Sequence, residues 1–314
     1  MRLAALFLFI TFLIACQNTG SKSGLRVIGF VDALEDVTLA EARKGFFNAL
    51  RDSGFVKDSS IKIIYRNAQN DMGVLSQSID YLVSQQVQVI ATNATISTIA
   101  AVQRNPHIPV CMMVSPEPSL AGLTDEAGNP PENLFGSYET LDYIDTALAL
   151  IPHLLPKARR VGTIINQSEP QSVDALNRIS EEGAKMGLQI VSLPVINSSE
   201  TQLVTESLLS QGIDVFFALP DNVIFSSFET IVAACNRAGV PVITSESGLV
   251  GRGALAAFGA DMYQWGYESG QSCATFLKTG KLPGPQKLKQ RRRVYNPEQA
   301  KRYNIVPDSA FKPI

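Results

Sequence analysis

The chain has 314 residues, of which 45% are hydrophobic and 18% are charged, and its formal net charge is −2. This length and apolar content are enough for one large domain or two ordinary domains with a substantial core. The near-neutral charge gives no reason to expect a nucleic-acid partner.

The N-terminal segment is apolar from residue 3 to residue 15 apart from Thr11, follows Arg2 and stops at Cys16. About a dozen apolar residues fall short of the roughly 20 that a membrane-spanning helix needs, and they fit the core of an export signal. The sequence Leu13-Ile14-Ala15-Cys16 resembles the bacterial lipobox. That resemblance implies cleavage before Cys16 and attachment of acyl chains, such as palmitate, through its diacylglyceryl group.

We therefore expect a lipoprotein signal peptide at residues 1–15 and a polar tether at residues 16–24. The rest of the protein would be exported and held at a membrane by lipid alone, in the periplasm or on the outer face of the cell membrane. An ordinary signal peptide with an incidental cysteine is the alternative.

Three cysteines follow the tether: Cys111, Cys235 and Cys273. An exported chain can form disulfides, but the number is odd and each cysteine lies in an apolar segment. Buried free thiols are therefore the expectation, with one disulfide and one leftover thiol as the alternative. No paired-cysteine spacing indicates a metal site.

Short β-rich segments alternate with helical segments along most of the chain. In the first helical segment, residues 38–54, Thr38 and Glu41 are spaced as a capping box and Gly54 ends the pattern. This alternation indicates βαβ units and parallel sheets. The predicted strands are 26–31, 61–66, 87–92 and 108–114, then 160–165, 188–193, 213–219 and 240–244.

The two halves resemble each other, since residues 67–92 parallel residues 196–219. We therefore predict an α/β fold of two doubly wound parallel-sheet lobes joined by a multi-strand hinge. The tail, with a strand at 253–261, a helix at 263–279 and a strand at 287–295, would complete both lobes. Lobe 1 would comprise residues 25–136 and 258–283, and lobe 2 residues 137–257 and 284–314.

Three short motifs point to a family. NAQND at residues 67–71, DVFFALPDN at 214–222 and GALAAFGADMYQWG at 253–266 occur in this order. They resemble motifs of the ABC transporter substrate-binding family that includes the tryptophan- and tyrosine-binding lipoproteins, with the type I periplasmic binding protein fold. The resemblance extends over residues 27–307.

The resemblance implies a monomer that captures a small polar solute such as an amino acid, aromatic amino acids included, and delivers it to an ABC permease and its ATPase. The chain departs from the family pattern at strand ends, at residues 92–95 and 115–118 and at Pro220 and Met262. Because ligands bind at strand ends, these departures concern the identity of the ligand.

The carboxyl ends of the predicted strands supply candidate ligand contacts, as in other open α/β sheets. Thr95 opens a helix, where free N–H groups favour a carboxylate, and Asp221, Glu246 and Asp261 suit an ammonium. Helix capping or hinge bonding is the alternative for each residue. The candidates are Glu35, Asn93, Thr95, Ser115, Glu117, Asn166, Asp221, Asn222, Glu246 and Asp261. Tyr138 and Tyr143 could cover an apolar ligand.

Enzymatic motifs are missing from the sequence. There is no G-x-G-x-x-G after the first strand, no Walker loop and no G-x-S-x-G elbow. The two histidines, His107 and His153, do not follow predicted strands on the cleft side. We therefore expect no catalysis, no cofactor and no metal. A nucleoside- or sugar-binding protein and a membrane-anchored ligand sensor remain alternatives, the former disfavoured by few aromatic residues at strand ends.

Overall fold

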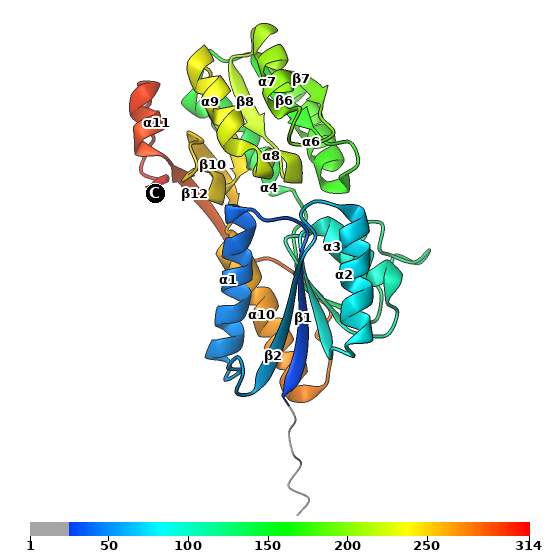
Figure 1. Ribbon diagram of the computed structural model, residues 1–314. Helices are drawn as coiled ribbons and strands as arrows, with labels where there is room; N and C mark the ends of the chain where they lie inside the picture. Colours follow the sequence, from blue (N-terminus) through cyan, green and yellow to red (C-terminus); the bar gives the residue numbers. More distant parts are fainter. Residues whose placement is uncertain (1–24) are drawn as a thin grey trace, which may run out of the picture.

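The computed structural model describes residues 25–314, which form two α/β lobes placed end to end (Figure 1). The predictions for the signal peptide, Cys16 and the tether lie outside the described residues. The two-lobed α/β fold with parallel sheets is confirmed. None of the described helices is long and apolar enough to cross a membrane.

The first lobe contains a fully parallel sheet in the order β11-β5-β4-β3-β1-β2. Helices α1 and α10 pack on one face of this sheet and α2 and α3 on the other (Figure 1). The strands are β1 (Arg26–Asp32), β2 (Ile61–Asn67), β3 (Val89–Asn93), β4 (Val110–Met113), β5 (Leu134–Tyr138) and β11 (Pro285–Lys287). The helices are α1 (Val37–Asp52), α2 (Met72–Ser84), α3 (Thr95–Arg104) and α10 (Met262–Thr279).

The second lobe contains a sheet in the order β13-β12-β10-β9-β8-β6-β7, parallel except between β10 and β12. Its strands are β6 (Arg160–Ile165), β7 (Gln189–Pro194), β8 (Val215–Ala218), β9 (Val242–Glu246), β10 (Ala256–Ala260), β12 (Arg291–Tyr295) and β13 (Lys312–Pro313). Its helices are α4 (Tyr143–Leu148), α5 (Leu150–Leu154), α6 (Pro170–Lys185), α7 (Thr201–Ser210), α8 (Asn222–Ser226), α9 (Phe228–Ala238) and α11 (Pro297–Arg302), with a 3₁₀ turn η1 (Ser247–Leu249).

Helices α1 and α10 pack closely because both carry glycine at their contact. A Cβ atom on Gly266 would lie 1.8 Å from the carbonyl oxygen of Ala42, and one on Gly45 would lie 2.0 Å from that of Tyr263. The predicted capping box of α1 is wrong: the N-cap is Asp36, whose carboxylate accepts from the N–H of Thr38 at 2.8 Å. The helix therefore begins one residue earlier than Thr38.

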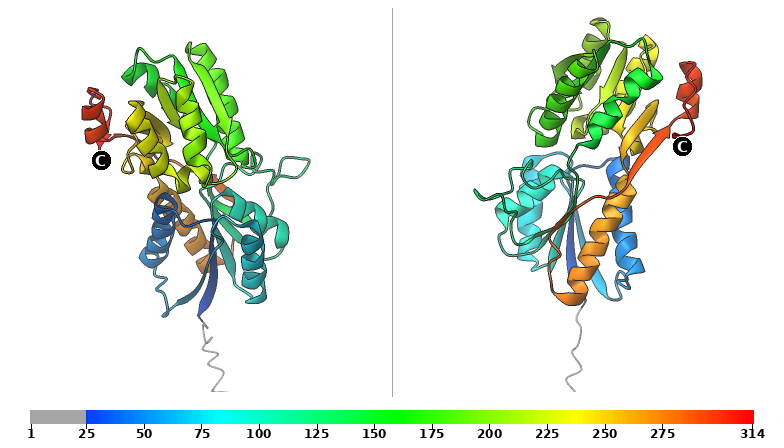
Figure 2. Two further views of the ribbon diagram at one scale, coloured as in Figure 1. Left: turned by 45° about the horizontal axis from the view of Figure 1, so that its top comes forward. Right: turned by 180° about the vertical axis from the view of Figure 1, so that it is seen from behind.

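The chain passes between the lobes three times, as Figure 2 shows from behind. The pairing of the strands assigns the three segments at the predicted lobe boundaries to other lobes than the prediction did. Residues 137–138 and 284–287 lie with the first lobe, because β5 and β11 pair with each other up to Tyr138 and Lys287. Residues 258–260 lie in the second lobe, because β10 pairs with β12 up to Ala260. The predicted strand at 287–295 is therefore two strands, one in each lobe.

Away from the crossings, Arg252 of the second lobe links the lobes. Its guanidinium donates to Asp36 at 2.7 Å and to Thr38 at 2.9 Å, both at the start of α1. The same group donates to the carbonyl of Phe225 at 2.7 Å and pairs with Glu229 at 2.7 Å within its own lobe. Arg252 thus bridges the lobes in the arrangement seen here.

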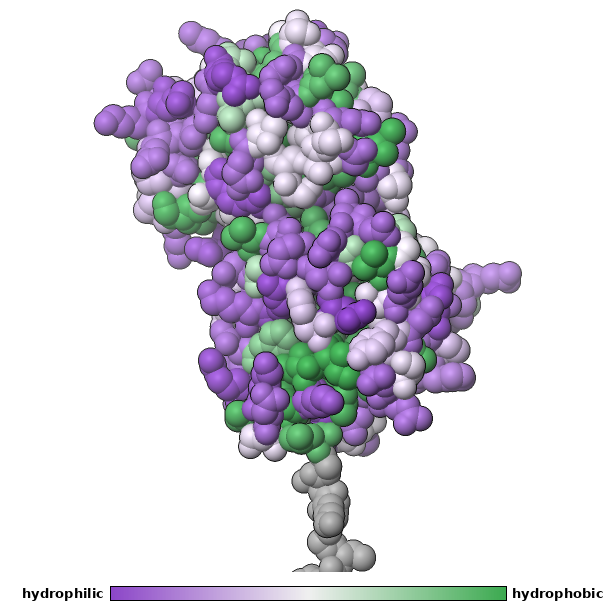
Figure 3. Space-filling view, in the orientation of Figure 1, coloured by the Kyte–Doolittle hydropathy of each residue, from purple (hydrophilic) through white to green (hydrophobic). Residues whose placement is uncertain are grey.

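The surface is largely hydrophilic on the face shown in Figure 3, with one apolar area on the first lobe. A groove between α1 and the edge strand β2 has an apolar floor that includes Phe47, Phe55 and Ile63. Cys111, Cys235 and Cys273 are buried free thiols in the structure, as expected.

Candidate ligand-binding site

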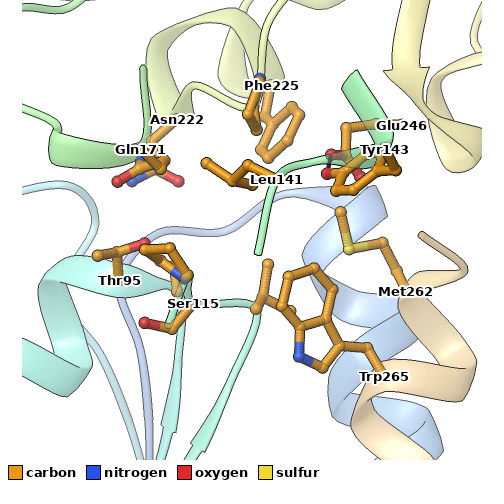
Figure 4. Close-up of a pocket in the computed structure, with 14 residues that line it drawn as sticks. Thr95, Ser115, Leu141, Tyr143, Gln171, Asn222, Phe225, Glu246, Met262 and Trp265 are labelled. Carbon is orange, nitrogen blue, oxygen red and sulfur yellow. Dashed lines mark hydrogen bonds between the residues drawn. The ribbon is translucent and has the colours of Figure 1, made fainter. Parts of the chain in front are cut away.

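A cavity lies between the lobes, at the carboxyl ends of the strands of both sheets. The empty space within it, counted together with the part open to solvent, is about 360 Å³. Both lobes, the first crossing and α10 contribute to its wall (Figure 4). The lining residues are Ala94, Thr95, Val114, Ser115, Pro116, Leu141, Tyr143, Gln171, Pro220, Asn222, Phe225, Glu246, Met262 and Trp265.

One end of the cavity is polar. Thr95 and Ser115 of the first lobe face Gln171 and Asn222 of the second lobe there (Figure 4). The Oγ of Ser115, the Oε1 of Gln171 and the Nδ2 of Asn222 are buried and have no hydrogen-bond partner within the protein. Buried polar atoms without partners are costly, about 1–3 kcal/mol each. These three atoms are therefore available to hydrogen-bond a ligand.

The N-terminus of α3 also opens at this end. Its N-cap residue is Ala94, which has no side-chain acceptor, so no side chain caps the first N–H groups of this ten-residue helix. Uncapped N–H groups and the helix dipole together favour an anion. With the Oγ of Ser115 alongside, this corner suits a carboxylate.

Three residues of the cavity wall have positive backbone φ angles. The φ angles are 78° at Ala94, 49° at Val114 and 60° at Leu141. Such conformations are uncommon without glycine and are unusual for a β-branched residue such as Val114. Strain of this kind, about 1–3 kcal/mol per residue, occurs most at binding and catalytic sites. Its presence on one cavity wall supports the assignment of this cavity as the functional site.

Two buried carboxyl groups lie behind the polar end. Glu169 accepts from the side chain of Gln171 and from the backbone N–H of Asn222. Asp221 accepts from the N–H of Asn166 at 2.8 Å and from two N–H groups at the start of α8. Burial raises the pKa of both groups, and the charge of Asp221 raises that of Glu169 further. Within residues 25–314, neither carboxyl forms a salt bridge.

The middle of the cavity is apolar. Leu141, Phe225, Met262 and Trp265 lie between the polar end and the opposite end (Figure 4). The indole N–H of Trp265 donates to the carbonyl of Ser137 at 2.8 Å, which fixes the ring in place. This part of the cavity suits the hydrophobic body of a ligand.

The opposite end holds Glu246 and Tyr143 (Figure 4). The hydroxyl of Tyr143 donates to the Oε1 of Glu246 at 2.6 Å, and the Oε2 of Glu246 is buried without a partner. Burial raises the pKa of Glu246 to about 8. The guanidinium of Arg291 lies 5.3 Å from the centre of the Tyr143 ring and pairs with Glu139 rather than with Glu246.

The structure brings together four of the ten candidate residues: Thr95, Ser115, Asn222 and Glu246 line the cavity. Asp221 lies directly behind it, and both of its carboxylate oxygens are used by backbone N–H groups.

The other five candidates lie outside the cavity wall. Asn93 donates to Asp32 and to the carbonyl of Leu39 in the interior of the first lobe. Glu35 pairs with Arg43 beside the groove of α1. Glu117 lines a separate surface depression. Asn166 supports Asp221, and Asp261 caps α10 and pairs with Arg292 at 3.1 Å.

Several lining residues were missed by searching only the residues that follow strands. Gln171 lies in the first turn of α6, directly after Pro170, and Phe225 lies in α8. Trp265, which was not among the candidates, also lines the cavity. Its position four residues after Asp261, in the first turn of the predicted helix, could have identified it as a residue near the strand-end site. Tyr143, considered as a cover for the ligand, is part of the wall.

Two doubly wound lobes with a cavity between them at their strand ends are the architecture of a two-lobed ligand-binding protein. Residues 27–310 match the model of the family described as ABC transporter substrate binding protein. The chain therefore belongs to the ABC transporter substrate-binding protein family, as the sequence motifs implied.

Among its relatives is the Tyrosine-binding protein of Clostridioides difficile (strain R20291), 34% identical over 268 residues, which are 85% of this chain and 76% of the relative. A structure of an ABC domain in complex with L-Trp from Streptococcus pneumonia superposes with a TM-score of 0.84 at 22% identity, covering 91% of this chain and 97% of that one.

The ligand-free, open structure of a substrate binding protein with adhesive properties from Clostridium difficile has a TM-score of 0.69 at 27% identity, covering 92% of this chain and 99% of that one.

Proposed function

We propose that this chain is the substrate-binding component of an ABC importer, which captures an aromatic amino acid between its lobes and delivers it to the permease and ATPase. The observation that carries the proposal is the division of the cavity into a polar end and an apolar middle. A zwitterionic head with a hydrophobic side chain has the same division. The aromatic ligands named for the relatives agree with it.

The ligand carboxylate would lie at the uncapped N-terminus of α3. Thr95 and Ser115 flank this position, and the Nδ2 of Asn222 offers a further donor from the second lobe. Contacts from both lobes to one group favour the closed arrangement, because the ligand makes all of them only when the lobes are together.

The ligand ammonium would lie against the Oε1 of Gln171, in front of Glu169 and Asp221. These two carboxyl groups are buried and have no cationic partner among residues 25–314. A cation in front of them lowers the cost of keeping negative charge in the interior. Asp221 would then act through its charge, since its oxygens already bind backbone N–H groups.

The proposal includes an exported protein that is anchored by lipid at Cys16 and functions as a monomer without catalytic turnover or cofactor. The lipobox-like sequence before Cys16 supports the anchor. A Cys16→Ala variant should leave the membrane fraction and lack the mass of the acyl chains, as measured by fractionation and mass spectrometry. Retention of the variant in detergent-washed membranes would contradict the anchor.

The ligand is tested by native mass spectrometry of the purified protein, followed by calorimetric titration with L-Tyr, L-Trp, L-Phe, L-Ala and myo-inositol. Aromatic amino acids should bind, and L-Ala should bind much more weakly because it leaves the apolar middle unfilled. Recovery of the ligand unchanged would agree with the absence of turnover. No binding of any aromatic amino acid would overturn the proposal.

The ammonium site is tested with Glu169→Gln, which keeps the size of the side chain and removes the ionisable carboxyl group. Affinity for the aromatic amino acid should fall about tenfold, since a charge-assisted interaction contributes about 1.5–3 kcal/mol. Glu181→Gln, on the exposed part of α6, for which Glu169 is the N-cap residue, is the control. Equal affinities of the two variants would remove Glu169 from the site.

A sugar or polyol is a second candidate ligand, because one structural neighbour from Bacillus halodurans, with a TM-score of 0.63 and 17% identity, holds myo-inositol. A sequence identity as low as this is evidence for a shared fold and not for a shared ligand. The apolar middle formed by Leu141, Phe225 and Met262 disfavours a ligand with hydroxyl groups on every side. The titration with myo-inositol distinguishes the two candidates.

A further inference from the structure

Glu246 is an unusual residue to find next to the apolar middle of the cavity. It is 1% exposed, and its Oε2 has no hydrogen-bond partner within the protein. Its Oε1 is held by the hydroxyl of Tyr143 at 2.6 Å, so the orientation of the carboxyl group is fixed. A buried polar atom left free in a fixed orientation costs free energy unless a ligand satisfies it.

The position of Glu246 separates it from the proposed site of the ligand head. Thr95, Ser115, Gln171 and Asn222 gather at one end of the cavity, and Glu246 and Tyr143 lie at the other (Figure 4). Leu141 lies between the two ends in the same view. A carboxylate and an ammonium carried by one carbon atom, bound at the polar end, therefore do not reach Glu246. The group that meets Glu246 is the far end of the ligand side chain.

We propose that Glu246, oriented by Tyr143, is the specificity residue of the site and hydrogen-bonds the hydroxyl of a para-hydroxyphenyl side chain, so that the ligand is tyrosine or a tyrosine-like amino acid. The inference rests on the proposed function, because it assumes an aromatic amino acid with its head at the polar end.

The chemistry of the two groups favours a hydroxyl over other side-chain tips. With its pKa raised to about 8, Glu246 is mainly protonated near neutral pH. Its Oε1 accepts from Tyr143, which leaves an O–H donor at Oε2. A phenolic hydroxyl can accept from this donor and can donate to the ionised form. The indole N–H of tryptophan only donates, and the ring of phenylalanine offers neither.

Discrimination by such a group is expected to be strong. A site built to hydrogen-bond a hydroxyl rejects the analogue that lacks it, because the buried protein group is then left without a partner. The wild-type protein should bind L-Tyr about tenfold to a hundredfold more tightly than L-Phe.

The test is a calorimetric titration of L-Tyr, L-Phe and L-Trp into the wild type and three variants. Glu246→Leu should abolish the preference for L-Tyr over L-Phe, and Glu246→Gln, which can still hydrogen-bond, should keep part of it. Tyr143→Phe should reduce the preference, because the carboxyl group loses its fixed orientation. Glu117→Ala, outside the cavity, should keep the wild-type ratio. Melting curves of the free proteins accompany the titrations. If Glu246→Leu does not fold, Glu246→Gln and Tyr143→Phe test the inference.

The outcomes separate the inference from the proposed function. Equal affinity of the wild type for L-Tyr and L-Phe, or a tyrosine preference that persists in Glu246→Leu, would overturn the role of Glu246 while the amino-acid-binding function stands. Tighter binding of L-Trp than of L-Tyr would also overturn it. Failure of all three aromatic amino acids to bind the wild type would reject the proposed function itself.

Discussion

At the residue scale, the carboxyl groups in and near this site are buried in surroundings that disfavour their charged forms. Burial raises the pKa of Glu246 to about 8 and that of Glu139 to about 7. Glu139 has Arg291 as a cationic partner, whereas Glu246 has only the neutral hydroxyl of Tyr143. The free protein therefore holds a protonated carboxyl in its cavity over much of the physiological pH range.

This protonation makes the stability of the protein depend on pH. The folded state binds the proton of Glu246 more tightly than the unfolded state does. The resulting stabilisation is fully present below the unfolded pKa, about 4.3, and is lost as pH rises through about 8.

The Tm of the ligand-free wild type should therefore fall between pH 5 and pH 8 relative to that of Glu246→Gln. We expect a difference of about 3 °C or more. Calorimetric scans at several pH values measure it, and Glu117→Gln, a variant outside the cavity, should follow the wild type. Parallel curves for the wild type and Glu246→Gln would show that Glu246 is ionised in the folded protein.

At the element scale, the contact between α1 and α10 joins segments that are far apart in the sequence. Backbone meets backbone there because Gly45 and Gly266 carry no Cβ atom. Helix α10 also supplies Met262 and Trp265 to the cavity wall, so this contact positions part of the site.

A Gly266→Ala substitution should force the two helices apart, since the new Cβ would lie 1.8 Å from the carbonyl oxygen of Ala42. Overpacking of this kind typically costs about 1–3 kcal/mol, and a lower Tm in calorimetry would show it. Gly251→Ala is the matched control, because its Cβ would meet no atom closer than 3.7 Å. A Tm equal to that of the control would mean that the helices can separate at little cost.

At the scale of the whole molecule, the side chain of Arg252 connects the second lobe to the start of α1 in the first lobe. It is 12% exposed and bonds to Asp36 and Thr38 of the first lobe and to Phe225 and Glu229 of the second. Because Phe225 also lines the cavity, this bridge is coupled to the position of the cavity wall.

An Arg252→Gln variant should favour the open arrangement, because the bonds to α1 exist only when the lobes are together. Affinity for the aromatic amino acid should fall about tenfold, and small-angle scattering of the free protein should give a larger radius of gyration. Arg237→Gln, whose partner Glu206 lies in the same lobe at 3.4 Å, is the control. Unchanged scattering and affinity would show that Arg252 does not hold the lobes together.

The fold could be predicted from the sequence because its signals are local. Each buried strand and each amphipathic helix carries its own periodicity, and the repeat between the two halves doubles the evidence. The division between β11 and β12 was missed because the alternation of basic residues runs through both strands and nothing in it marks the passage between lobes.

The cavity could be predicted only in part because its wall is assembled from both lobes. Thr95, Ser115, Asn222 and Glu246 lie at or just after strand ends and were found by the strand-end rule. The same rule selected Asp221, whose carboxylate turns to the start of α8 instead of the cavity. Gln171 and Trp265 belong to helices, and the side of a helix that meets the other lobe depends on how the lobes are arranged.

The place of α10 in the first lobe has a consequence for the order in which the chain folds. Residues 262–279 cover the sheet face against which α1 packs, yet the whole second lobe up to β10 precedes them in the sequence. As the chain emerges N-terminus first, the first lobe therefore lacks one of its covering helices until the second lobe has nearly all appeared. The lobe that begins the chain is completed late, so a chain truncated before residue 262 would leave apolar residues such as Phe46 exposed to aggregation.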